Sequence, residues 1–162
     1  MSPLVASIEA EQCFISFYLV YNFIIEIARH MQNSKKILVI DDSQTSLLII
    51  EDVLLEAGYE VELCDNPKHA LKKILHDVPD LIILDLILPK MDGLTFYEKI
   101  AHLCIPTIMI SGKSNSILRE RAKKEGIIGF MSKPIRVQQL IETINLIFTE
   151  STTLKNNNHY FN

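Results

Sequence analysis

The chain has 162 residues, of which 48% are hydrophobic and 22% are charged, and its formal net charge is −4. This length allows one domain with a sizeable core, and the charge excludes the basic footprint expected of a direct nucleic-acid binder. The three cysteines lie far apart and match neither a disulfide framework nor a metal site, so we expect a reducing, cytoplasmic location.

The first 34 residues differ from the rest of the chain. Residues 12–25, QCFISFYLVYNFII, form an apolar run of 14 residues, whereas a membrane-spanning helix needs about 20. The segment has no basic start and no small-residue cleavage site, so it does not fit a secretory signal. It is interpreted as a packing helix or as a start placed too early, with Met31 as the alternative start. An interfacial membrane helix ranks below both.

The first predicted strand covers residues 36–40, KILVI, and ends at Asp41 and Asp42. Ser43 follows and can cap a helix that runs to about Ala57, where a glycine stops it. This part of the sequence therefore predicts a buried strand, two acids at its carboxyl end, and a helix.

The second strand is marked by alternation. Charged and apolar residues alternate over 60–64, EVELC, which predicts a strand nearer an edge of the sheet. Asn66 and Pro67 then supply an N-cap and a first helical position, and an apolar stripe follows at helical spacing.

The stretch over 79–93, PDLIILDLILPKMDG, is the most informative. Residues 81–84 are wholly apolar, the pattern of a central strand buried on both faces of a parallel sheet. Asp85 follows directly, and a proline, an aspartate and a glycine then turn the chain. A carboxylate thus stands at the carboxyl edge of the sheet, where ligands bind in open α/β folds.

Strands and helices alternate five times, which predicts an α/β fold with a doubly wound, five-stranded parallel sheet and helices on both faces. The later elements are a helix over 94–103, a strand over 106–110, a helix over 115–125, a strand over 127–131 and a helix over 136–148. We expect a domain over 35–150, an N-terminal, helical extension over 1–34, and a flexible tail over 151–162. No glycine-rich phosphate loop follows the first strand.

Four of the five predicted strands end at a notable polar group: Asp41-Asp42, Asp85, Ser111 and Lys133. Three carboxylates crowded at one edge repel one another, and a divalent cation with oxygen ligands such as Mg²⁺ relieves that repulsion. A nearby ammonium and hydroxyl can stabilise a further anionic group. These are the parts needed to place a phosphoryl group on a carboxylate.

The motifs resemble the receiver domain of two-component response regulators, the chemotaxis-regulator-like fold, over about residues 35–150. They are VIDDS at 39–43, IILDLILPKMDGL at 82–94, MISGK at 109–113 and GFMSKP at 129–134. Each is weak alone, but all four occur in order and with matching spacing. Only the stretch between Gly93 and Pro106 is a few residues short, which suggests a trimmed third helix or loop.

The resemblance implies a role for each matching position at the phosphorylation site. Asp85 is the phosphoacceptor, and Asp41, Asp42 and the backbone carbonyl of Ile87 complete a Mg²⁺ site with it. Lys133 pairs with Asp85 and then with the phosphoryl group.

The resemblance also implies a switch. Ser111 moves to hydrogen-bond the phosphoryl group, and Phe130 matches the switch aromatic of the family, although it could also be an ordinary core residue. The Lys133–Pro134 bond resembles one that the family keeps cis.

By this resemblance, the chain is a single-domain response regulator that receives a phosphoryl group from a phosphohistidine of a sensor kinase or phosphotransfer protein. It is not an enzyme, apart from slow loss of its own phosphoryl group, and it signals through a partner protein rather than through nucleic acid or membrane. One alternative is a protein-binding module with the receiver fold that works without phosphate. An aspartate-nucleophile phosphatase fits less well, because its DxDxT motif is missing after the first strand.

Two hypotheses concern single residues, the first of them at a variable position that flanks the phosphorylation site. Ile87 cannot hydrogen-bond an attacking water, so we expect slow loss of phosphate. The run over 47–50, LLII, spans more than one helical face, so Leu47 or Leu48 is expected either in the docking patch for the histidine-bearing partner or against the apolar N-terminal segment.

Overall fold

The computed structural model describes residues 20–21, 34–112 and 116–157. The chain divides into two compact units, Met1–Ser34 and Lys35–Asn162. In the first unit only Val20, Tyr21 and Ser34 are described, and the first two are helical and half-exposed. The rest of the predicted N-terminal extension lies outside the described residues, so its nature stays a prediction. No described helix has the length and apolar character that crossing a membrane requires.

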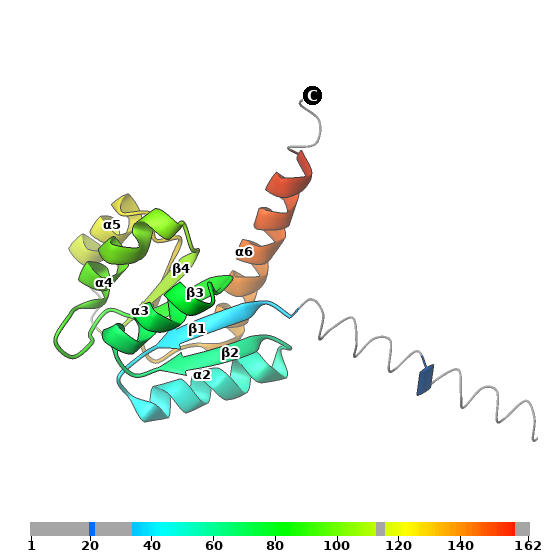
Figure 1. Cartoon of the computed structure of the whole chain (residues 1–162), viewed down its shortest axis with the longest axis horizontal. Coiled ribbons are helices and arrows are strands. Elements are labelled where there is room, and N and C mark those ends of the chain that lie inside the picture. Colours follow the sequence, from blue (N-terminus) through cyan, green and yellow to red (C-terminus); the bar gives the residue numbers. More distant parts are fainter. Residues whose placement is uncertain (1–19, 22–33, 113–115, 158–162) are drawn as a thin grey trace, which may run out of the picture. The chain divides into compact units, whose positions relative to one another are not determined.

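The second unit is built on one five-stranded sheet (Figure 1). Its strands are β1 (Lys36–Ile40), β2 (Glu60–Cys64), β3 (Leu81–Asp85), β4 (Thr107–Ser111) and β5 (Gly129–Ser132). They pair in the order β2-β1-β3-β4-β5, and every pair is parallel. The α/β prediction is therefore confirmed, with β3 buried at the centre and β2 at an edge.

Helices cover both faces of the sheet and enclose two hydrophobic cores. They are α2 (Gln44–Glu56), α3 (Pro67–His76), α4 (Gly93–Ile100), the 3-10 turn η1 (Ala101–Leu103), α5 (Ser116–Lys124) and α6 (Val137–Asn157). One core joins α3, α4 and α5 to the sheet, and the other joins α2 and α6. Alternate residues of each central strand enter opposite cores, as in Ile82 and Ile83.

The helix ends follow the predicted signals. The side chains of Ser43 and Asn66 accept hydrogen bonds from the first-turn N–H groups of α2 and α3. Gly58 and Gly126 follow α2 and α5 with φ of 86° and 99°, a left-handed conformation that ends helices and favours glycine.

The lengths of two helices can be compared with the predictions from sequence. Helix α4 has 8 residues before η1, in keeping with the short stretch noted above. Helix α6 continues to Asn157, so the predicted end at Phe148 was wrong. Residues 151–157 are helical, and the flexibility of the tail over 151–162 stays a prediction. The sequence after Phe148 holds neither glycine nor proline, and therefore nothing stops a helix already formed.

Candidate functional site

Five polar side chains meet at the carboxyl edge of the sheet. Asp41 and Asp42 follow β1, Asp85 and Ser111 are the last residues of β3 and β4, and Lys133 directly follows β5. The parallel ladder fixes their spacing along the edge, with Asp85 opposite Ile110 on β4. The N–H of Lys133 donates to the carbonyl of Ser111 at 2.8 Å, which anchors the start of the last loop.

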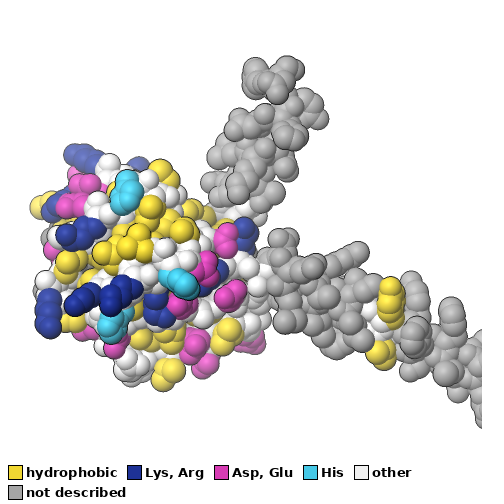
Figure 2. Space-filling view, viewed as in Figure 1, with side chains coloured by type: hydrophobic (Ala, Val, Ile, Leu, Met, Phe, Trp, Pro, Cys, Tyr) yellow, Lys and Arg dark blue, Asp and Glu magenta, His cyan; other side chains and the backbone are white. Residues whose placement is uncertain are grey.

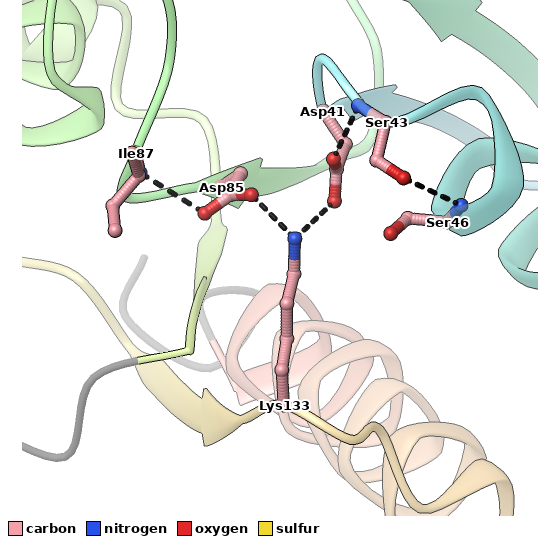
Figure 3. Close-up of polar contacts among 6 residues, drawn as sticks. All are labelled: Asp41, Ser43, Ser46, Asp85, Ile87 and Lys133. Atoms are coloured by element: carbon pink, nitrogen blue, oxygen red, sulfur yellow. Dashed lines mark hydrogen bonds and ion pairs between the residues drawn. The ribbon is translucent and has the colours of Figure 1, made fainter.

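The ammonium group of Lys133 joins two buried carboxylates (Figure 3). Its Nζ lies 2.7 Å from Oδ2 of Asp41 and 2.5 Å from Oδ2 of Asp85. Those two carboxylate side chains are 2% and 5% exposed, whereas the lysine side chain is 26% exposed. Desolvation alone lowers the pKa of Lys133, but hydrogen bonds to Asp41 and Asp85 outweigh it and hold that pKa above its usual value.

Backbone amides hold the second oxygen of each buried carboxylate. Oδ1 of Asp41 accepts from the N–H of Ser43 at 2.9 Å, and Oδ1 of Asp85 accepts from the N–H of Ile87 at 3.0 Å. Each carboxylate therefore accepts a hydrogen bond from the backbone two residues later, in the loop that follows its strand. The arrangement fixes both groups in orientation before any ligand binds.

Three carboxylates form a cluster that could hold a metal. Oxygen atoms of Asp41, Asp42 and Asp85 all lie within 4.8 Å of one another, and Asp42 is exposed. A few oxygen ligands open to water on one side suit Mg²⁺, which keeps several waters when bound. The predicted metal residues are thus brought together, while the role of the Ile87 carbonyl stays a prediction.

The loop after β3 returns to the strand through Gly93. A Cβ atom built on this glycine would lie 2.2 Å from the carbonyl oxygen of Asp85, too close for any side chain. The N–H of Gly93 donates to the carbonyl of Leu86 at 2.8 Å. The sequence marked Gly93 as a turn residue only, because the contact that requires glycine joins two ends of a folded loop.

The two predicted switch residues lie on neighbouring strands. Ser111 is fully buried at the end of β4. Phe130 on β5 is partly buried, opposite Met109, and the guanidinium of Arg119 lies 5.0 Å from the centre of its ring. The sequence did not identify Arg119, since no pattern links it to Phe130. The switch movement itself stays a prediction.

The run over 47–50 divides between core and surface. Leu47 is 2% exposed and packs in the core with Ile50 and Leu54, so of the two leucines named as alternatives for a docking patch it is the less suited. Leu48 and Ile49 are 55% and 54% exposed. The part of that hypothesis that concerns Leu48 stays open.

Comparison with known proteins gives matches across most of the second unit. The model of the response regulator receiver domain family matches residues 37–145. The chain is 30% identical to the chemotaxis protein CheY of Bacillus subtilis over 113 residues, which cover 68% of this chain and 94% of that protein. It is also 30% identical over 120 residues to PhoP, the alkaline phosphatase synthesis transcriptional regulatory protein of Bacillus subtilis. That match covers 73% of this chain but only 50% of the length of PhoP.

Solved structures agree in fold. A CheY-like receiver domain protein from Methanospirillum hungatei JF-1 superposes with a TM-score of 0.71 at 28% identity, covering 75% of this chain and 98% of that one. The chemotaxis protein CheY4 of Vibrio cholerae gives a TM-score of 0.66 at 28% identity, covering 69% and 97%. The chain therefore belongs to the response regulator receiver domain family.

Proposed function

We propose that Asp85 accepts a phosphoryl group from a phosphohistidine of a sensor kinase or a histidine phosphotransfer protein. Receiver domains in general are non-enzymatic phosphoacceptors of two-component signalling and interact with histidine kinases. The observation that carries the proposal is the single ammonium of Lys133 held by Asp41 and Asp85, beside the third carboxylate of Asp42.

The reaction exchanges one bond to phosphorus for another. A carboxylate oxygen of Asp85 attacks in line as the P–N bond to the imidazole of the donor breaks, and the imidazole nitrogen then takes up a proton from water. Lys133 follows the negative charge from the carboxylate to the phosphoryl oxygens. Ser111, buried at the end of the neighbouring strand, donates a hydrogen bond to one of them.

The acidic triad is typical of the Mg²⁺ site of receiver domains. We infer that Asp41, Asp42 and Asp85 hold the ion together with the carbonyl of Ile87. When bound, Mg²⁺ supplies charge neutralisation for the incoming phosphoryl group. The excess of carboxylates over the one ammonium supports this assignment, because Lys133 offsets only one of three negative charges.

The output passes to a separate protein in this proposal. The match to the chemotaxis protein CheY covers 94% of that protein, so a receiver unit of this size occurs without a further domain in that relative. Phosphorylation shifts an equilibrium between two conformations. Ser111 and Phe130 change position, which alters the surface formed by α5, β5 and α6.

The intact mass of the 162-residue protein after incubation with acetyl phosphate and Mg²⁺ tests this function. We expect the wild type to gain one phosphoryl group and Asp85→Asn to gain none. Asp65→Asn serves as the matched control, because Asp65 is exposed at the end of β2 and lies outside the acidic cluster. Labelling of Asp85→Asn would overturn the assignment, and absence of labelling in the wild type would favour a module that works without phosphate.

A further inference from the structure

The outer edge of β2 has no strand beside it in the described part of the chain. Backbone groups of alternate residues in a strand point to opposite sides. The N–H of Glu60 donates to Lys35, and the carbonyl of Cys64 accepts from Asp41, so both residues turn toward β1. The N–H and C=O groups of Val61 and Leu63 therefore point outward.

Two cavities lie along α3 beside β2, and the first of them also reaches α2. One, of about 470 Å³, reaches from Gln44 and Leu63 to α3. The other, of about 420 Å³, continues along Glu62 to the end of α3. Lys72 and Lys73 line both. The two cavities therefore adjoin along α3, with Leu63 of β2 lining the first, and are called the groove.

Helix α3 gives its side of the groove a basic face, whereas Glu62, Asp65 and Asp77 also line the cavities. His69, Lys72, Lys73 and His76 recur at the i, i+3, i+4 and i+7 positions of one helical face, and all four line the cavities. Helix α3 contains no acidic residue. Lys73 pairs with Glu62 at 2.5 Å, whereas Lys72 makes no ion pair with any residue the structure describes. Lysine and histidine side chains gather over α3 in Figure 2.

On the α2 side, Gln44 and Leu47 line the groove. Leu48 and Leu55, elsewhere on α2, are 55% and 53% exposed, and Val61 and Leu63 pack partly against the core beneath this helix. Strand β2 itself shows this division of side chains between the two faces of the sheet. Glu62 points to the lysines near α3, whereas Val61 and Leu63 point to α2. A strand added outside β2 meets the same two surfaces.

We propose that the outer edge of β2 binds an extended segment of a partner protein in which acidic and aliphatic residues alternate, and adds it to the sheet as a sixth strand. The acidic side chains lie along the basic face of α3 and the aliphatic ones along α2. A second copy of this chain fits less well. Antiparallel pairing of β2 with β2 would place the basic faces of both α3 helices side by side, and like charges repel. The proposal does not depend on phosphorylation of Asp85.

Titration of the full chain with the peptide acetyl-EVELEVE-amide tests the electrostatic part. We expect binding that slows hydrogen exchange at the N–H groups of Val61 and Leu63, and no such effect with the charge-reversed peptide KVKLKVK. Lys72→Glu should weaken binding at least about fivefold. Lys68→Glu should change it by less than about twofold, because Lys68 lies on the same helix but lines a different cavity with Pro89 and Lys90.

N-methylated peptides test strand addition independently of charge. Methylation of the amides on one alternate set of residues should abolish binding, and methylation of the other set should preserve it, since only one set faces β2. Equal binding of both methylated peptides, equal binding of KVKLKVK, or protection confined to other strands would overturn the proposal. Dimers of the free protein in which the N–H groups of Val61 and Leu63 are protected from exchange would also overturn it, because they would identify a second copy as the occupant. Labelling of Asp85 by acetyl phosphate is expected to be unchanged in Lys72→Glu, which separates failure here from failure of the proposed function.

Discussion

Lys133 shares one ammonium group between Asp41 and Asp85, two carboxylates that the fold almost fully buries. Removing it leaves two buried negative charges without their common partner, which is costly because burial deprives them of water. The residue thus has a structural role in the resting protein as well as its proposed role toward a phosphoryl group.

We predict that Lys133→Met lowers the free energy of unfolding by about 2 kcal/mol at pH 7, a discounted value because this lysine is partly exposed. Mg²⁺ should restore part of the loss, since a cation bound by the native carboxylates stabilises the folded state. Urea denaturation with and without Mg²⁺ measures both effects, and Lys68→Met is the exposed control. A loss that Mg²⁺ does not reduce would contradict the shared-charge interpretation.

Ile87 lies two residues after Asp85, with its side chain 50% exposed above the site. An aliphatic side chain there cannot orient a water molecule toward phosphorus. We predict that Ile87→Asn shortens the half-life of the phosphorylated protein several-fold, while Ile87→Val leaves it unchanged. The decay of the phosphorylated mass after removal of acetyl phosphate gives both half-lives, and equal values for the Asn variant and the wild type would count against the hypothesis.

At the level of elements, the loop between β3 and α4 depends on one glycine. Gly93→Ala places a methyl group against the Asp85 carbonyl, and we predict a loss of about 2–3 kcal/mol in unfolding free energy. Gly112→Ala, whose added Cβ has no atom of the described residues within 4 Å, is the matched control and should be nearly neutral. Similar losses in the two variants, measured by urea denaturation, would show that the close approach to Asp85 is not what requires glycine.

Glu62 on β2 forms ion pairs with α3 and β1. Its Oε1 lies 2.5 Å from Nζ of Lys73, and its Oε2 lies 3.1 Å from Nζ of Lys36. Desolvation raises the pKa of Glu62, but hydrogen bonds from the two lysines outweigh it and bring that pKa below the usual 4.5. A carboxyl group whose pKa is lower in the folded protein than in the unfolded chain stabilises the fold fully at a pH above the unfolded-state pKa. This stabilisation is lost as the pH falls through the lowered, folded-state pKa.

We therefore predict that Glu62→Gln lowers the free energy of unfolding by about 1 kcal/mol at pH 7. The difference in unfolding free energy between this variant and the wild type should shrink steadily below pH 4.5. Glu60→Gln is the control, because Glu60 is exposed and forms no ion pair within the described residues. Urea denaturation across this pH range checks the prediction. A difference that stays constant down to pH 3 would show that the ion pairs do not supply it.

The elements differ in how far sequence determines them. Buried strands such as β3 can be predicted from sequence, because a short, unbroken apolar run next to turn residues fits few structures other than a central strand. The end of α6 could not be predicted from sequence. Polar residues without glycine or proline do not by themselves determine whether a helix continues or ends. The contacts of Gly93 and Arg119 were also not readable, because each joins residues whose proximity exists only after folding.

For the whole molecule, the topology produces the site. Parallel strands end at one edge, so the groups at 41, 85, 111 and 133 converge although up to 92 positions separate them. That convergence was predictable from alternation and from the residue after each strand. The hydrogen bonds of Ser43 and Ile87 to the carboxylates and the sharing of Lys133 depend on loop geometry, which the sequence pattern does not determine.

The central claim is that Asp85, and not a neighbouring carboxylate, carries the phosphoryl group. Borohydride reduces an acyl phosphate to an alcohol and so marks the modified aspartate permanently. Peptide mapping of the acetyl phosphate-treated protein after this reduction should place the mark on Asp85 alone, and its yield should fall when Mg²⁺ is removed. A mark on Asp41 or Asp42 would contradict the assignment of the acceptor.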